Sequence, residues 1–287
     1  MSRKICISAV DGNTGFAIAE LILQHREFSR KVDSVIGLAF DPKSERAAEL
    51  KNLGAVIVPH VPGRVKDVAK SLKDSGADTV CIVPPARQNK LDVCAELVDA
   101  AKTAQATNVC LISSAGCDYA DPKRQPRLRE FIDLEALVLQ AKGDASTPTG
   151  GSPCDVAHVA AHVLTGRGKH GFDDAHRGQM MVVTGPKLCA GNELATAAGN
   201  ALGTEMKFED ISEAEAKRVL KSQSDSDQSE QQYLLEYYSL VREGKTNYIA
   251  TTAFHDVTGD HPTEPDDFFR MYQNEMRPNK KAKRNHK

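Results

Sequence analysis

KICISAVDGNTGFAIAELILQ, residues 4–24, combines a strand, a tight turn and a helix in one short stretch. Lys4 to Val10 is rich in β-branched and apolar side chains, which favours a buried strand. The DGNTG that follows supplies residue types that form turns. From Phe16 to Gln24, apolar residues recur at helical spacing. A strand that turns at once into a helix predicts the first unit of a parallel sheet covered by helices.

The same alternation continues along the chain. Further apolar runs predict strands at residues 35–40, 55–58, 79–83 and 109–113. Amphipathic segments between and after them predict helices at residues 44–53, 65–74, 91–104 and 127–142. Near-continuous apolar strands separated by helices are typical of a doubly wound parallel sheet with both faces covered. The sequence therefore predicts an α/β domain over residues 1–142.

The second half is less regular. Residues 143–154, GDASTPTGGSPC, are polar and rich in turn-forming residues, so they predict a loop where a sixth strand is expected. Residues 155–275 predict a helix that completes the sheet domain and a smaller α/β C-terminal domain, with a strand near residues 206–211. Residues 276–287 end in RPNKKAKRNHK, which predicts a disordered basic tail.

Composition names no macromolecular partner. The net charge of -2 gives no field strong enough to favour nucleic acid, and the apolar runs are too short to cross a membrane. Seven cysteines without a CxxC pair, and no secretory leader, predict a reducing compartment. We expect a cytoplasmic protein, with the nucleus as the alternative because of the basic tail.

The first turn carries the chemistry. In a doubly wound sheet a ligand binds beyond the carboxyl ends of the strands, where the first helix points free N–H groups at phosphate. Gly12 and Gly15 let the backbone approach closely, and Asn13 and Thr14 offer hydrogen bonds at the start of the helix. Ile18 stands where a third small residue is usual. The turn predicts a dinucleotide site, and a purely structural turn is the alternative.

Several segments resemble the NmrA-like family of atypical short-chain dehydrogenases, and the resemblance covers most of the chain. They are SAVDGNTGFAIAELIL, FDP after the second strand, SSAG after the fifth, VVTGPKLCAGNELATAAGNALG, and the closing YYSLVREGKTNYIATTAFHDVTGDHPTEPDDFFR. The resemblance implies a Rossmann domain with a small C-terminal domain and binding of NADP or NAD. It also implies either a redox-sensing regulatory role or reduction of a small molecule such as a quinone.

The resemblance also assigns binding residues. The pyrophosphate would lie at Gly12, Asn13, Thr14, Gly15 and Phe16, and the adenosine ribose at Phe40, Asp41 and Lys43. Val83, Pro84 and Pro85 would flank the cofactor, and Ser113 and Ser114 would approach the nicotinamide ribose. Many relatives place an arginine at the position of Phe40, so here Lys43 or Arg46 must supply the charge that NADP requires. Asp41 could instead accept from a free ribose hydroxyl, so the preference between NADP and NAD stays open.

No catalytic residue is predicted. Tyr119 and Lys123 have the spacing of a tyrosine–lysine pair, but Pro122 lies between them and would disrupt the helix that must align them. The lysine that many related reductases carry ahead of a helical glutamate, here Glu135, is replaced by Ile132.

The predicted function is therefore an NAD(P)-binding regulatory protein with little or no catalysis and a protein partner. The alternative is an NAD(P)H-dependent reductase of a small carbonyl or quinone. Compared with the family, a few dozen residues around the sixth strand are absent. That absence predicts a shortened isoform, a deletion or a gene-model error, and an incomplete pocket.

Overall fold

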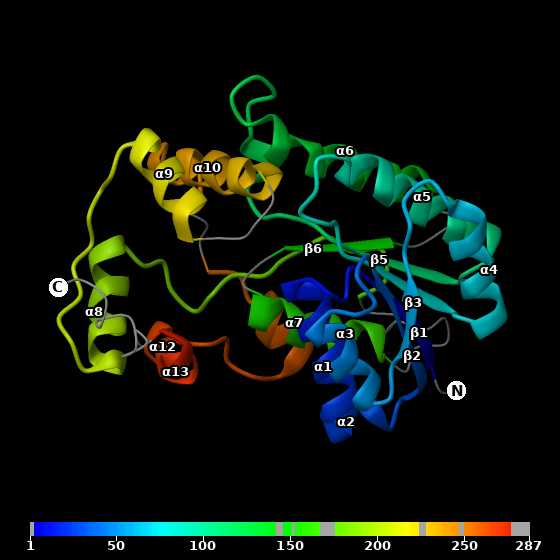
Figure 1. The fold of residues 1–287 in the computed structure, drawn as a ribbon. Helices are drawn as coiled ribbons and strands as arrows, with labels where there is room; N and C mark the ends of the chain where they lie inside the picture. The colour runs from blue at the N-terminus through cyan, green and yellow to red at the C-terminus, as the bar shows by residue number, and fades with distance from the viewer. Residues whose placement is uncertain are drawn as a thin grey trace, which may run out of the picture.

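The computed structural model describes residues 3–141, 146–150, 153–166, 176–223, 228–246 and 250–276. Within them the strands form one parallel sheet in the order β3-β2-β1-β4-β5-β6-β7 (Figure 1). The strands are β1 Arg3–Ser8, β2 Val32–Ala39, β3 Val56–Pro59, β4 Thr79–Ile82, β5 Asn108–Ile112, β6 Ser146–Gly150 and β7 Met181–Val182. The predicted doubly wound parallel sheet is confirmed.

Helices cover both faces of the sheet (Figure 1). One face carries α1 Asn13–Gln24, α2 Arg26–Ser29, α3 Glu45–Asn52, α7 Pro153–Leu164 and α11 Ala253–Thr258. The other face carries α4 Val65–Ser75, α5 Lys90–Thr103 and α6 Pro126–Ala141. Strand β1 shows why both layers form: Ile5 and Ile7 enter the first core, whereas Cys6 between them enters the second.

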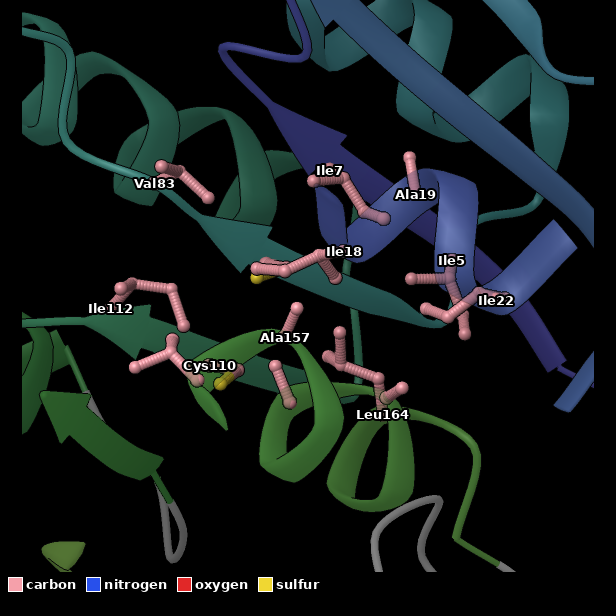
Figure 2. Packing of buried hydrophobic residues seen from close by; sticks show 14 of the residues in the cluster. Ile5, Ile7, Ile18, Ala19, Ile22, Val83, Cys110, Ile112, Ala157 and Leu164 are labelled. Atoms are coloured by element: carbon pink, nitrogen blue, oxygen red, sulfur yellow. The ribbon is translucent and has the colours of Figure 1, made fainter. Parts of the chain in front are cut away.

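Ile18 is accommodated by its neighbours in the first core. It is fully buried where α1 packs on α7, and α7 contributes Ala157, Ala160 and Ala161 to the same core. Figure 2 shows Ile18 between the sheet and α7, with Ala157 on the facing helix. Small residues on α7 therefore provide the space that a small residue of α1 provides in the usual dinucleotide pattern.

The prediction that no sixth strand forms was wrong. Residues 146–150 form β6, which pairs with β5 from Val109↔Ser146 to Ile112↔Thr149 and with β7 at Thr149 and Gly150. The pairing uses backbone groups, so a strand can form without the apolar run on which the prediction relied. The sheet consequently extends beyond residue 142.

The C-terminal part is helical where the structure describes it. It contains α8 Gly191–Leu202, α9 Glu213–Gln223, α10 Gln228–Arg242, α12 Pro265–Met271 and α13 Gln273–Met276. The strand predicted at residues 206–211 is not formed: Met206 and Phe208 are exposed, and the Phe208 ring lies against Gly191. Helices α12 and α13 pack on α8, and α10 packs on both α9 and α6. Most of the predicted tail, residues 277–287, lies outside the described residues.

No helix among the described residues is long and apolar enough to span a membrane.

The turn between β1 and α1 brings backbone into unusually close contact. A Cβ added at Gly15 would lie 2.4 Å from the carbonyl oxygen of Ala9 and 2.8 Å from that of Ser8. Ala9 itself has a φ of 50°, in the left-handed region that L-residues rarely adopt. Gly15 is therefore required so that the first turn of α1 can begin directly over the end of β1.

We expect Gly15→Ala to lower the free energy of unfolding by about 3 kcal/mol, roughly 6 °C or more in Tm, because its Cβ would meet backbone that cannot move aside. Thermal unfolding followed by circular dichroism measures the change. Gly185→Ala is the matched control, since a Cβ there meets nothing within 4 Å. Equal Tm values for the two variants would contradict the packing described here.

Candidate functional site

A cavity of about 710 Å³ opens at the carboxyl ends of β1, β4 and β5. Strand β1 is the switch point of the sheet, because β2 lies on one side of it and β4 on the other. Ligands of doubly wound proteins bind at such a point. The cavity is lined by segments that follow β1, β4, β5 and β7 and by α10, including Asn13, Thr14, Val83, Pro84, Pro85, Ser113, Ser114, Thr184, Tyr233 and Tyr237.

The first turn of α1 lies at this cavity, and no side chain caps its backbone N–H groups. Gly12 is the N-cap residue and makes no side-chain cap hydrogen bond, so the first-turn N–H groups are not capped by a side chain of their own helix. Asn13 and Thr14 line the cavity, and Gly15 is buried beneath them. The side chain of Phe16, which is predicted at the pyrophosphate, packs against the hydrophobic core. The turn can therefore present N–H groups and a partial positive charge to an anion.

Arg46 of α3 contacts the glycine-containing turn between β1 and α1, and Asp11 of that turn contacts the loop after β2. Its guanidinium donates to Asn13 Oδ1 at 2.5 Å and to the carbonyl of Asp11 at 3.3 Å. Asp11 Oδ2 accepts the N–H of Asp41 at 2.8 Å, and Asp41 Oδ1 accepts the N–H of Lys43 at 2.9 Å. These two carboxylates fold the loop, whereas Arg46 places an exposed cation beside the turn.

Phe40 lies in an aromatic stack at the same loop. Its ring is 4.8 Å from that of His60 at an interplanar angle of 21°, and the Arg87 guanidinium lies 4.2 Å from its centroid. His60 is buried, and neither ring nitrogen has a hydrogen-bond partner among the described residues. Burial lowers the pKa of His60, so it is neutral at pH 7. Arg87, which the sequence analysis did not identify, thus supplies a second cation near the position of Phe40.

The predicted residues after β4 border the cavity on its β1 side. The Ser8 hydroxyl accepts the N–H of Val83 at 2.8 Å and donates to the carbonyl of Val83 at 3.2 Å. The two strands are thereby tied together just past the end of their ladder, at Ile7↔Cys81. Pro84 and Pro85 follow, and their fixed φ angles make this edge rigid.

The two serines after β5 have different partners. Ser113 Oγ donates to Glu135 Oε1 of α6 at 2.5 Å, and the buried Cys117 thiol lies 3.5 Å from the same oxygen. Burial raises the pKa of Cys117 to about 12, so it is a neutral thiol. Ile132 packs against the second core, so this position provides no titratable group. Ser113 is thus held by α6.

Ser114 is paired with a tyrosine of α10. Its Oγ lies 2.8 Å from the hydroxyl of Tyr233 on α10, and both residues line the cavity. Burial raises the pKa of Tyr233, so its phenol is protonated at neutral pH. The two hydroxyls together form a polar spot on an otherwise largely apolar wall.

Lys90, the first residue of α5, is a buried cation in the same wall. Its Nζ donates to the carbonyl of Arg127 at 2.9 Å, lies 3.5 Å from Glu130 Oε2 and is 3.8 Å from the ring centroid of Phe131. Burial lowers the pKa of Lys90 to about 8, although Glu130 opposes that shift. A lysine with such a pKa can change its protonation state close to physiological pH.

Helix α10 is fixed to the start of α6. Glu236 Oε2 accepts the N–H of Leu128 at 2.9 Å, in the first turn of α6, where an anion is favourable. The Gln125 amide donates to Ser239 Oγ at 2.8 Å. Burial raises the pKa of Glu236. These contacts hold Tyr233 over Ser114.

The tyrosine–lysine pair considered in the sequence does not enter the cavity. Tyr119 ends the short 3-10 helix Cys117–Tyr119 and is 51% exposed, and the backbone of Lys123 caps an exposed turn at Asp121. Arg87, Lys90 and Tyr233 were not predicted. The sequence signal around Tyr233 is the amphipathic pattern of residues 231–243, which is more typical of a helix packed on the core than of a binding site.

No protein-family model matches this sequence, and no curated protein does. Solved structures define the class of fold: the chain has the Rossmann-type α/β fold of several reductases. The NADPH-dependent quinone oxidoreductase of Escherichia coli in complex with NADPH is 15% identical with a TM-score of 0.74, over 93% of this chain and 99% of that chain. The triphenylmethane reductase of Citrobacter sp. complexed with NADP(H) is 14% identical, with a TM-score of 0.74 over 94% and 99%. The leucoanthocyanidin reductase of Vitis vinifera with NADPH is 16% identical, with a TM-score of 0.70 over 94% and 99%.

Because of Lys90, the free energy of unfolding should change with pH in the alkaline range. Between about pH 8 and its ordinary pKa of 10.5, the unfolded chain binds a proton that the folded chain does not. The free energy of unfolding of the wild type should therefore rise through this window relative to Lys90→Met, by up to roughly 3 kcal/mol. Urea denaturation at a series of pH values measures the difference, with Lys123→Met as the exposed control. A difference that stays constant with pH would show that Lys90 has an ordinary pKa.

Proposed function

We propose that this chain is an NADP(H)-dependent reductase of a quinone or another small conjugated carbonyl compound. One observation carries the proposal: a single cavity at the switch point contains the open start of α1 and the Ser114–Tyr233 hydroxyl pair, with Lys90 in its wall. The start of α1 suits the diphosphate of a dinucleotide, and the hydroxyl pair and Lys90 suit the oxygen of the substrate that is reduced. Membership in the NmrA-like family stays a prediction.

The residues present fit a dinucleotide. Gly12 and Gly15 allow backbone N–H groups to approach a diphosphate, and the start of α1 adds the favourable end of a helix dipole. The stack of Phe40, His60 and Arg87 gives a flat surface at the loop where the adenosine is expected. We place the nicotinamide end near Ser113 and Ser114, across the switch point from that loop. The NADPH and NADP(H) complexes of the similar folds support this assignment.

The charged residues in and just after the loop that follows β2 favour NADP(H) over NAD(H). Lys43 and Arg46 are exposed cations beside the glycine-rich turn. The carboxylates that would instead accept from a ribose hydroxyl, Asp11 and Asp41, already accept backbone N–H groups of the loop. A 2′-phosphate would therefore lie beside cations. Many relatives have an arginine at the position of Phe40, and in this chain Arg46 of α3 would supply that charge.

The acceptor end of the cavity suits a flat apolar molecule. Phe131, Val156 and Leu234 line it together with Tyr237, and the polar groups concentrate at Ser114 and Tyr233. Such a wall matches a quinone, which has an apolar ring and two oxygens that accept hydrogen bonds. The bound dinucleotide would supply the hydride.

A redox-sensing regulator has less support. That prediction relied on the lack of a residue able to exchange a proton near the nicotinamide, and the cavity contains Tyr233 and, in its wall, Lys90. No observation on the described residues specifically favours a protein partner. We therefore propose the reductase.

Calorimetric titration with NADPH, NADP⁺, NADH and NAD⁺, followed by an assay of NADPH oxidation with a quinone panel, tests the proposal. We expect micromolar binding of the phosphorylated forms and quinone-dependent oxidation of NADPH. Absence of binding by all four dinucleotides would refute it, and binding without turnover of any quinone would favour the regulator.

Arg46→Gln should weaken NADPH binding about tenfold or more, because it removes a charge-assisted contact to the 2′-phosphate. NADH has no such phosphate, so its affinity should stay within about twofold. Lys66→Gln is the control, since Lys66 is exposed on α4 at the opposite face of the sheet. Equal losses for NADPH and NADH would mean that Arg46 supports the turn through Asn13 rather than selecting the cofactor.

A further inference from the structure

Three side chains from distant parts of the sequence meet in the acceptor wall. Ser114 follows β5, Tyr233 lies on α10 and Lys90 begins α5. The Ser114 and Tyr233 hydroxyls are 2.8 Å apart, and the Lys90 ammonium lies 5.9 Å from the Tyr233 ring centroid. The sequence separations exclude any common motif, so only the fold brings these residues together.

Burial raises the pKa of the Tyr233 phenol, whereas its hydrogen bond with Ser114 lowers it. Tyr233 is mostly buried, and its hydroxyl shares a hydrogen bond with Ser114 at the cavity surface. A buried phenolate is unstable unless a positive charge lies nearby. Lys90 is a buried cation near this ring, and its side chain is only 6% exposed, so water screens it little.

We propose that Tyr233 is the proton donor of the reductase, that Ser114 binds the same substrate oxygen, and that Lys90 is a positioning residue that stabilises the Tyr233 phenolate. The proposal rests on the proposed function, and it adds the residues that complete the reaction.

The proposed step balances as follows. Hydride from the reduced nicotinamide dinucleotide, which becomes oxidised, converts the quinone to a hydroquinone monoanion. The O–H bond of Tyr233 breaks as an O–H bond forms on the anionic oxygen, and the neutral hydroquinone leaves a phenolate on Tyr233. Water then returns a proton to Tyr233. Ser114 donates a hydrogen bond to the substrate oxygen throughout, and Lys90 does not exchange atoms with the substrate.

The proposal predicts a particular pH dependence. The Lys90 ammonium faces Glu130 and Arg127 of α6, Cys94 of α5 and the Tyr233 ring of α10. Tyr233 is influenced by Tyr237 on its own helix and by Cys117 beside α6, and Glu230 also lines the cavity. Because burial lowers the pKa of Lys90 to about 8, the support for a phenolate should be lost as the pH rises through that value.

The variants for the test are Tyr233→Phe, Lys90→Met and Lys90→Arg. Tyr119→Phe and Lys123→Met make the same chemical changes outside the cavity and serve as matched controls. Thermal unfolding and NADPH affinity establish that each variant is folded. If Lys90→Met does not fold, Tyr233→Phe and Lys90→Arg decide the outcome.

The first readout needs no turnover. Menadione is titrated calorimetrically into protein saturated with NADP⁺, a complex that holds no hydride to transfer. We expect Tyr233→Phe to weaken menadione binding about fivefold, because a hydrogen bond to the quinone oxygen is lost. Tyr119→Phe should leave the affinity unchanged.

The second readout is the pH profile of menadione reduction by NADPH. Tyr233→Phe should lower kcat about 100-fold. Wild-type kcat should fall as the pH rises through about 8. Lys90→Arg should keep the high rate beyond that pH, and Lys90→Met should show, at every pH, the low rate that the wild type reaches in alkali.

The outcomes separate this inference from the proposed function. A wild type that binds no NADP(H) overturns both. A wild type that binds NADP(H) but neither binds nor reduces menadione overturns the inference alone. The inference is also overturned if Tyr233→Phe has the same menadione affinity and kcat as Tyr119→Phe, or if kcat of Lys90→Arg falls near pH 8 as it does in the wild type.

Discussion

The close approach of the first turn of α1 to the end of β1 sets the geometry of the whole cavity. Gly15 permits it, because any side chain there would meet the carbonyl oxygens of Ser8 and Ala9. Ser8, at the end of β1, also links this strand to β4, because its hydroxyl hydrogen-bonds to both the N–H and the carbonyl of Val83. The open start of α1 and the rigid prolines after β4 therefore border one crevice, and every group that we assign to the dinucleotide is placed relative to it.

The acceptor end depends on a second, longer-range contact. Helix α10 is joined to the sheet domain by hydrogen bonds to the start of α6, where Glu236 accepts from Leu128 and Ser239 accepts from Gln125, and by Leu240, which is buried in the second core. A buried carboxylate at a helix N-terminus is favourable because it satisfies an N–H group that has no partner within its helix. This contact brings Tyr233 over Ser114, so the C-terminal helices complete the cavity rather than form an independent unit.

Most of the fold could be predicted from hydrophobic pattern alone. Strands β4 and β5 are almost entirely buried and therefore appear in the sequence as continuous apolar runs, and β3 at the edge of the sheet is also apolar although it is partly exposed. Strand β6 has no such run, because it gains its place through backbone pairing with β5, and its Ser146 to Gly150 segment resembles a loop. The opposite error occurred at residues 206–211, where apolar residues such as Phe208 pack on Gly191 without joining a sheet. The hydrophobic pattern of a sequence therefore indicates which residues are buried, but it does not indicate which segments pair as strands.

The sequence by itself determined the part of the cavity that we assign to a dinucleotide. Gly12 to Gly15 lie in one turn next to one strand, so local chain geometry places them, and the same holds for Val83 to Pro85 and Ser113 to Ser114. Only the tertiary structure decided the rest. It brought Arg87 onto Phe40, tied Arg46 to the glycine-rich turn and grouped Lys90 with Tyr233 and Ser114. The physical reason is that these side chains come from separate helices, and their protonation depends on burial, which no local pattern specifies.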